Sequence, residues 1–134
     1  MLTLYVMCGV PGSGKSTLSK QMAEEHGLTR ISYDELRCRH QSEFIRPAVA
    51  ALRDDKDTIM DSTNLRISER KNILQAVADI PCKKVVVFMN TSLQECLYRN
   101  AHREARLSEI AVEGMHRIMQ KPTLAEGWDE IIVI

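Results

Sequence analysis

Two kinds of hydrophobic pattern alternate along this 134-residue chain. Short apolar runs rich in β-branched residues predict strands, and segments with apolar positions three and four residues apart predict helices. The predicted strands cover residues 2–8, 30–32, 58–60, 83–89 and 131–134, and the predicted helices cover residues 16–26, 47–53, 69–78, 93–106 and 109–120. Such alternation is typical of a parallel sheet flanked by helices, so the chain predicts an α/β fold.

Residues that favour helix ends mark several of these boundaries. We expect the following to act as caps, first-turn residues or stops: Ser68, Ser92 with Glu95, Ser108, Pro47 and Gly27. The sequence shows no repeat, no low-complexity stretch and no linker rich in Gly, Ser or Pro. We therefore expect a single domain over residues 1–134.

Composition narrows the classes of partner. Lys plus Arg number 18 and Asp plus Glu number 18, so a global positive field that draws the protein to nucleic acid or membrane is excluded. The four cysteines, Cys8, Cys38, Cys82 and Cys96, lack metal-ligand spacing and indicate reduced thiols in a cytoplasmic protein. The apolar start of the chain is too short to span a bilayer and lacks a basic leader, so we expect a buried strand there and no membrane partner.

The strongest motif lies between the first predicted strand and the first predicted helix. Residues 9–16 read GVPGSGKS and fit the phosphate-binding pattern GxxxxGK[ST]. Glycines let successive backbone N–H groups point at the β- and γ-phosphates of a nucleotide, and the helix N-terminus adds positive charge. The expected nucleotide contacts come from Gly9, Gly12, Ser13, Gly14, Lys15, Ser16 and Thr17, with Lys15 on the β/γ oxygens and Ser16 on Mg²⁺.

Acidic residues follow the next two predicted strands, at the edge where open α/β sheets place their chemistry. Asp34 is the candidate base or orienting carboxylate for a hydroxyl acceptor, with an N-cap as the alternative role. Arg37, one helical turn further on, is placed to hold an anionic part of the acceptor. Asp61 follows an apolar strand in the arrangement that binds Mg²⁺, and Asn64 either binds substrate or closes a turn.

Three arginines recur on one face of the predicted helix 93–106. Arg99, Arg103 and Arg106 lie at positions i, i+4 and i+7, which suits a lid over residues 99–108 that clamps a transferring phosphate. The alternative is a solvated basic stripe paired with nearby glutamates. Trp128, just before the last strand, either lies near a nucleobase or plugs the sheet edge.

These motifs together resemble the small P-loop kinases of the polynucleotide 5′-hydroxyl kinase type. The matching segments are GVPGSGKST at 9–17, SYDELR at 32–37, DSTNLRISER at 61–70, RNAHR at 99–103 and EGWDEI at 126–131. The resemblance implies a five-stranded parallel sheet with helices on both faces. It also implies that Asp34 is the general base, that Arg37 holds the acceptor's phosphate, and that Arg103 stabilises the transition state beside Lys15.

The expected activity is ATP- and Mg²⁺-dependent phosphorylation of a 5′-hydroxyl end of DNA or RNA. A kinase for a small molecule, such as a nucleoside or sugar, is the second possibility. A nucleotide-binding regulatory ATPase is the third, although the sequence contains no NKxD-type base-recognition segment. Stimulation of ATP turnover by an added acceptor separates the kinases from the ATPase.

Overall fold

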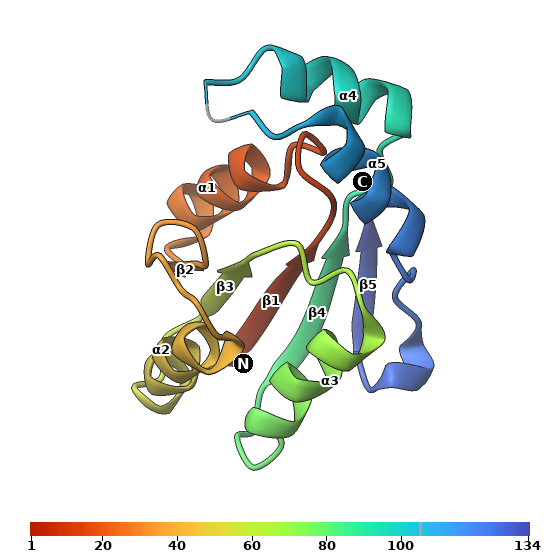
Figure 1. Ribbon diagram of the computed structural model, residues 1–134. Helices are drawn as coiled ribbons and strands as arrows, with labels where there is room; N and C mark the ends of the chain where they lie inside the picture. Colours follow the sequence, from red (N-terminus) through yellow and green to blue (C-terminus); the bar gives the residue numbers. More distant parts are fainter. Residues whose placement is uncertain (105) are drawn as a thin grey trace.

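Five parallel strands form one sheet in the order β2-β3-β1-β4-β5 in the computed structural model, which describes residues 1–104 and 106–134 (Figure 1). The strands are β1 (Thr3–Cys8), β2 (Thr29–Ser32), β3 (Thr58–Asp61), β4 (Lys83–Phe88) and β5 (Glu130–Val133). The helices are α1 (Lys15–His26), α2 (Gln41–Arg53), α3 (Ile67–Ala76), α4 (Leu93–Ala101) and α5 (Glu109–Ile118), with a short 3₁₀ turn η1 (Leu124–Glu126). The predicted α/β class, five-stranded parallel sheet and helix order are confirmed.

Alternation along β1 explains why helices cover both faces of the sheet. Leu4, Val6 and Cys8 are fully buried on the face that also holds α2 and α3. Met7 points the opposite way, into a second cluster that includes Leu18 from α1. A central parallel strand buried on both faces has a nearly continuous apolar run, and the first predicted strand is apolar at every position except Thr3.

The carboxyl ends of the strands all point to one edge, where the loop after β1 lies beneath α4 and α5 (Figure 1). A small apolar cluster joins these parts, with Val10 from the loop, Cys96 from α4 and Val112 from α5 all buried. The chemistry-bearing segments of the sequence therefore meet at this edge, as expected for an open α/β sheet.

Helix α2 corrects one prediction. The sequence places a helix start at Pro47, but α2 begins at Gln41 and contains Pro47 in its interior. Phe44, Ala48 and Leu52 fall on one face at four-residue spacing and are all buried. Burial of that continuous apolar stripe outweighs the hydrogen bond that proline removes.

Helix α4 corrects another prediction, because it ends at Ala101 and not at Arg106. The Asn100 side chain explains the stop: its Nδ2 donates to the Leu107 carbonyl at 2.8 Å, and its Oδ1 accepts from the Leu107 N–H at 3.0 Å. This pair of bonds closes the connection to α5 as a loop. Ser92 and Ser108 cap α4 and α5 as predicted, whereas Ser68 lies inside α3, whose N-cap is Arg66.

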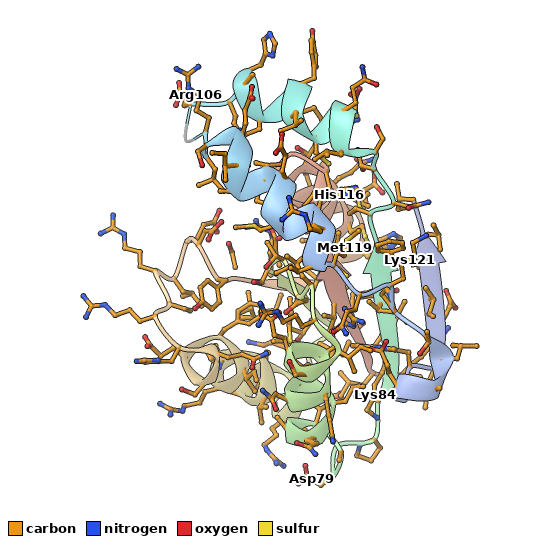
Figure 2. The ribbon with its side chains drawn as sticks, turned by 45° about the vertical axis from the view of Figure 1, so that its right-hand side comes forward. Asp79, Lys84, Arg106, His116, Met119 and Lys121 are labelled. Carbon is orange, nitrogen blue, oxygen red and sulfur yellow. The ribbon has the colours of Figure 1, made fainter. Side chains whose placement is uncertain are left out.

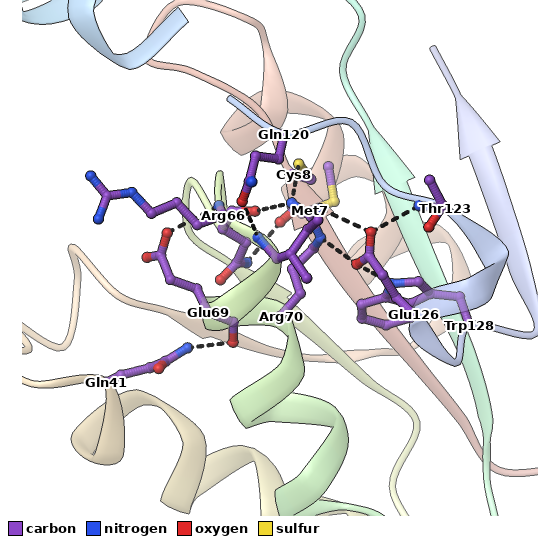
Figure 3. Close-up of polar contacts among 12 residues, drawn as sticks. Met7, Cys8, Gln41, Arg66, Glu69, Arg70, Gln120, Thr123, Glu126 and Trp128 are labelled. Atoms are coloured by element: carbon purple, nitrogen blue, oxygen red, sulfur yellow. Dashed lines mark hydrogen bonds and ion pairs between the residues drawn. The ribbon is translucent and has the colours of Figure 1, made fainter. Parts of the chain in front are cut away.

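A buried ion pair fastens the end of the chain to the core (Figure 3). Arg70 on α3 is fully buried and donates to Glu126 from Nε at 2.8 Å and from Nη2 at 3.1 Å. Its Nη1 donates to the Asn64 carbonyl at 2.9 Å, and Trp128 Nε1 donates to Glu126 at 3.1 Å. Trp128 is 4% exposed within the core cluster, which confirms the predicted plug.

Within the described ranges, none of the helices has the length and apolar character that a bilayer span requires.

Candidate active site

The loop between β1 and α1 has the backbone shape that phosphate binding needs. Gly12 and Gly14 have φ of 83° and 93°, in the left-handed region that favours glycine. A Cβ at Gly12 would clash with the carbonyl oxygen of Cys96 on α4, and one at Gly14 would lie 3.0 Å from a guanidinium nitrogen of Arg99. Only glycine therefore fits at these two positions, where the loop passes under the lid.

Lys15 opens α1 and is 8% exposed. Burial lowers its pKa, the carboxylates of Asp61 and Asp34 oppose this shift, and the guanidiniums of Arg103 and Arg30 add to it. Four charged groups from distant segments thus act on the Lys15 ammonium. An anion at Lys15 would restore the balance between burial and charge, which is the environment that a nucleotide phosphate needs.

Ser13 carries the second sign that the loop fits a nucleotide. Its Oγ is buried and has no hydrogen-bond partner among the described residues. Its carbonyl oxygen accepts from Thr91 Oγ1 at 3.1 Å and from Arg99 Nη1 at 3.0 Å. Hydrogen bonds from α4 and from the segment before it therefore hold the Ser13 carbonyl in place. A buried hydroxyl without a partner is costly, and a polar ligand atom would satisfy it.

Asp61 at the end of β3 is buried and already paired. Its Oδ2 accepts from Ser19 Oγ at 2.9 Å and from Arg30 Nη2 at 2.6 Å. Arg30 also donates from Nη1 to Glu35 at 2.9 Å and from Nε to Ser19 at 2.9 Å. Because Oδ2 is committed to these donors, Oδ1 is the oxygen through which Asp61 would reach a metal-bound water.

Asp34 follows β2 in a turn over residues 33–37 and is exposed. The next helix begins only at Gln41, with His40 at the N-cap position, so the alternative of Asp34 as a helix cap is wrong. Asp34 lines a pocket of about 290 Å³ together with Lys15, Tyr33 and Phe44. Its role as general base stays a prediction.

Arg37 lies outside the side chains that line this pocket. The prediction that it stands one helical turn from Asp34 is wrong, because residues 33–37 form turns and Arg37 has a left-handed φ of 54°. Its N–H donates to the Asp34 carbonyl at 3.0 Å, and its side chain is exposed. The predicted contact between Arg37 and an acceptor therefore lies outside this pocket and stays a prediction.

Asn64 has a structural role in the loop after β3, the second of the two alternatives that its sequence position suggested. It has a φ of 44° and is 2% exposed. Its Nδ2 donates to the Met7 carbonyl at 2.7 Å, which ties the loop after β3 to β1. Asn64 also lines the same pocket as Asp34, so its contact with an acceptor stays a prediction.

The lid arginines do not share one helix face, because α4 ends before Arg103. Arg99 is held by Glu95 Oε1 at 3.0 Å and by the Ser13 carbonyl. Arg103 follows the helix end and lines a cleft of about 280 Å³ together with Arg99, Gly12 and residues 14–17. Arg106 is exposed at the far end of the α4–α5 connection and outside that lining (Figure 2).

Two pockets therefore meet at one side chain. Lys15 lines the cleft beside the glycines, Ser16, Thr17 and Arg103, and it also lines the pocket that holds Asp34. A phosphate donor in the first pocket and an acceptor in the second would both contact this ammonium. Two adjoining pockets that share one cationic side chain would suit transfer between a donor and an acceptor.

A resident metal centre is not built from this chain's own side chains. Among the described residues, no group of three or more His, Cys, Asp or Glu side chains is placed to hold a metal ion. Mg²⁺ commonly keeps several waters and binds through substrate phosphates with one or two protein oxygens. Ser16 and Asp61 fit that smaller role.

Several residues of the site were missed by sequence reasoning. Arg30 lies in a short strand of a buried sheet. A charged residue in such a strand indicates that an oppositely charged side chain lies nearby, because charges are rarely buried unless they are paired. Asn100 falls inside the RNAHR segment but was not assigned a role. Gln41 and Phe44 were hidden because the sequence placed the start of their helix too late.

A five-stranded parallel sheet with a phosphate loop after β1, and with Arg99 and Arg103 lining a cleft beside that loop, is typical of the class of P-loop kinases. The model of the family described as AAA domain matches residues 4–122, and the chain belongs to this family. A bifunctional polynucleotide phosphatase/kinase of Schizosaccharomyces pombe is 28% identical over 133 residues, which cover 96% of this chain and 32% of that protein. The chain thus spans about a third of that relative's length.

Two further proteins show the breadth of the similarity. A cytidylate kinase of Ignicoccus hospitalis is 32% identical over 123 residues, which cover 84% of this chain and 71% of that enzyme. The crystal structure of a fungal RNA kinase superposes with a TM-score of 0.78 at 18% identity, covering 99% of this chain and 73% of the other. The resemblance to polynucleotide kinases is confirmed, while the relatives themselves differ in acceptor.

Proposed function

We propose that the protein transfers the γ-phosphate of ATP to the 5′-hydroxyl end of DNA or RNA, with Mg²⁺ as cofactor. The observation that carries this proposal is that Lys15 lines both the phosphate-loop cleft and the pocket that holds Asp34. A transferring phosphate at Lys15 would face an acceptor hydroxyl beside a carboxylate. That arrangement suits in-line transfer.

The phosphate loop binds and orients the donor. Backbone N–H groups of residues 14–17 and the Lys15 ammonium would hold the β- and γ-phosphate oxygens, because the Ser13 N–H already donates to the Val10 carbonyl at 3.1 Å. Ser16 and, through a water, Asp61 would hold the metal, which supplies charge neutralisation on those oxygens. Arg103 stands at the open side of the cleft, where a guanidinium stabilises charge that develops in the transition state.

Asp34 handles the acceptor proton. The acceptor oxygen forms a bond to the γ-phosphorus as the bond from that phosphorus to the β–γ bridging oxygen breaks, and the acceptor proton passes to the Asp34 carboxylate. ADP leaves with the electron pair of the broken bond. Asp34 is exposed, so its proton then passes to solvent.

The loop between Asp34 and α2 carries three basic side chains. Arg37, Arg39 and His40 are all exposed on the loop that leads into α2. We expect Arg37 to hold a phosphate on the 3′ side of the terminal nucleoside, and few further phosphates to be bound because the net charge is zero. Arg37→Ala should then raise the KM of a phosphate-bearing acceptor and leave ATP affinity unchanged.

Two other functions remain candidates. Similarity to a cytidylate kinase favours a small-molecule kinase as the alternative. A regulatory ATPase is less well supported, because the sequence lacks an NKxD-type segment and the pocket that holds Asp34 offers space for an acceptor larger than water. Acceptor-stimulated ATP turnover separates the ATPase from either kinase.

The deciding experiment incubates the protein with labelled ATP and a panel of acceptors. The panel holds 5′-hydroxyl oligonucleotides of DNA and RNA, nucleoside 3′-monophosphates, free nucleosides, cytidine 5′-monophosphate and sugars. We expect the highest kcat/KM for the 5′-hydroxyl oligonucleotides, with nucleoside 3′-monophosphates as usable substrates. A free nucleoside or sugar that outperforms both would overturn the choice and favour the small-molecule kinase.

A further inference from the structure

The acceptor pocket has room for one sugar or nucleoside and little more. Its volume of about 290 Å³ lies at the small end of ligand pockets. The loop after β3 and the first turn of α3 form one wall, and Tyr33 with Phe44 forms another. The two rings meet edge to face with centroids 5.5 Å apart. The remainder of any larger acceptor must extend outside this pocket.

The charges that line this pocket do not favour an anion. Lys15 is its one cation among the described lining residues, while Asp34 and Glu69 contribute two carboxylates. Lys15 is also the residue that the donor phosphates use. With a donor bound, an acceptor would meet two negative charges and no free positive one.

Glu69 is held rigidly in the wall (Figure 3). It is the third residue of α3, and its Oε1 accepts from the Arg66 N–H at 3.1 Å in a capping box. Its carbonyl accepts from Gln41 Nε2 at 2.8 Å, and Gln41 Oε1 in turn accepts from Asn72 at 2.8 Å. The capping bond engages Oε1, so a donor on the acceptor would meet Oε2.

This placement removes a site that an anion could otherwise use. The N-terminus of a helix attracts negative charge, and at α3 the Glu69 carboxylate already occupies that position. The phenol of Tyr33 is affected by the same negative charges. Burial raises the pKa of Tyr33, and the negative charges of Cys38, Glu43, Glu69 and Asp34 raise it further.

We propose that Glu69 makes the inner acceptor pocket selective for an uncharged group that carries a hydrogen-bond donor, and excludes a phosphate or carboxylate from it. The inference rests on the proposed function, and it divides the acceptor in two. The terminal nucleoside enters the pocket with a sugar hydroxyl or a base amino group toward Glu69. Its 3′ phosphate stays outside this pocket.

The capping box supplies a sharp test, because Gln serves at its third position as well as Glu. Glu69→Gln therefore keeps the helix cap and removes the charge, and its melting temperature should match that of the parent. Glu43→Gln is the matched control, since Glu43 is exposed, lies in the first turn of α2 and does not line the pocket. Both variants lose one carboxylate close to the acceptor side.

The readout is the ratio of kcat/KM for paired 5′-hydroxyl oligonucleotides. One pair differs only in the 2′-hydroxyl of the first nucleotide, and the other places cytidine or uridine first, so that position 4 of the base carries an amino donor or a carbonyl acceptor. We expect the parent to prefer the donor-bearing partner in at least one pair by about tenfold, a value typical of a hydrogen bond to a charged group. Glu69→Gln should bring that ratio near one, and Glu43→Gln should keep it. Ratios of one in the parent, or ratios unchanged by Glu69→Gln, overturn the inference.

A third pair separates this inference from the proposed function. It compares a neutral sugar with its sugar acid as acceptors. If the parent phosphorylates no oligonucleotide, the proposed function fails, and the sugar pair still tests Glu69. The neutral partner should be preferred by about tenfold in the parent, and the preference should narrow in Glu69→Gln. An equal or better sugar acid, or no phosphorylation of any acceptor, overturns the inference.

Discussion

Arg30 donates from Nη2 to Asp61 Oδ2 at 2.6 Å, so the carboxylate expected to serve the metal is already ion-paired. The two residues come from neighbouring strands, β2 and β3, which pair at Ser32 and Asp61. The Arg30 side chain is 13% exposed and Asp61 is 3% exposed, so solvent screens the pair weakly. Arg30 therefore sets how much negative charge Asp61 can offer to a cation.

Arg30→Gln should change the metal dependence of the enzyme. Loss of the guanidinium leaves Asp61 with more uncompensated charge, so the Mg²⁺ concentration for half-maximal activity should fall, while the folded state loses about 3 kcal/mol. A Mg²⁺ titration of kinase activity and a denaturant titration measure the two effects. Lys20→Gln is the control, because Lys20 makes only an exposed contact of 3.9 Å with Glu35 and should leave both unchanged. An unaltered Mg²⁺ midpoint in Arg30→Gln would show that the pair is purely structural.

Asp34→Asn should separate nucleotide binding from transfer. The amide cannot accept the acceptor proton, so kcat should fall by about 10² or more, as is usual when a general base is lost. ATP affinity, measured by titration, should stay at the parent value because Asp34 lies in the acceptor pocket. Lys15→Ala should instead lower activity by at least about 100-fold, because the donor phosphates lose the ammonium that neutralises them. Normal turnover by Asp34→Asn would demote the carboxylate to a loop residue.

Arg103 and Arg106 should differ sharply although only two positions separate them. Arg103 lines the phosphate-loop cleft and Arg106 does not. Arg103→Ala should lower kcat by about 10³, and Arg103→Lys should be nearly as damaging, because an ammonium lacks the planar fork of a guanidinium. Arg106→Ala should be mild. Small, equal effects on kcat at both positions would favour a solvated basic stripe.

Glu126 should make the protein sensitive to acid. Burial raises the pKa of Glu126, but hydrogen bonds from Arg70, Thr123 and Trp128 and the charge of Arg70 outweigh it, so the folded pKa lies below the ordinary value of 4.5. A lowered folded pKa gives stability that is present above pH 4.5 and is lost as the pH falls through the folded value.

The melting temperature should therefore drop on acidification below about pH 4.5, and Glu126→Gln should flatten that drop. At neutral pH, Arg70→Met should cost about 3 kcal/mol, because it leaves a buried carboxylate without its partner. The exposed pair of Arg53 and Asp79 provides the control: Asp79→Asn should change the stability little. Identical acid profiles for Glu126→Gln and the parent would contradict the assignment.

The parts of the site that the sequence predicts are those made by one continuous segment. The phosphate loop needs only the strand before it, its glycines and the helix after it, so residues 9–17 identify it without any distant contact. The five strands are predicted from apolar runs in the same way, because each strand buried in a parallel sheet carries apolar residues along its own length.

The long-range contacts of the site depend on the tertiary structure and cannot be predicted from local sequence patterns. Arg30 meets Asp61 across 31 residues, and Asn100 stops α4 by binding the Leu107 backbone, which no helical periodicity reveals. In the sequence Glu69 is only the first residue of a predicted helix, whereas the structure places it in the lining of the pocket that holds Asp34. Local propensity determines where elements form, whereas the partner of a buried charge depends on which elements the core brings together. For this protein the sequence determined the phosphate loop and the sheet, and the tertiary structure determined the charge of the acceptor pocket.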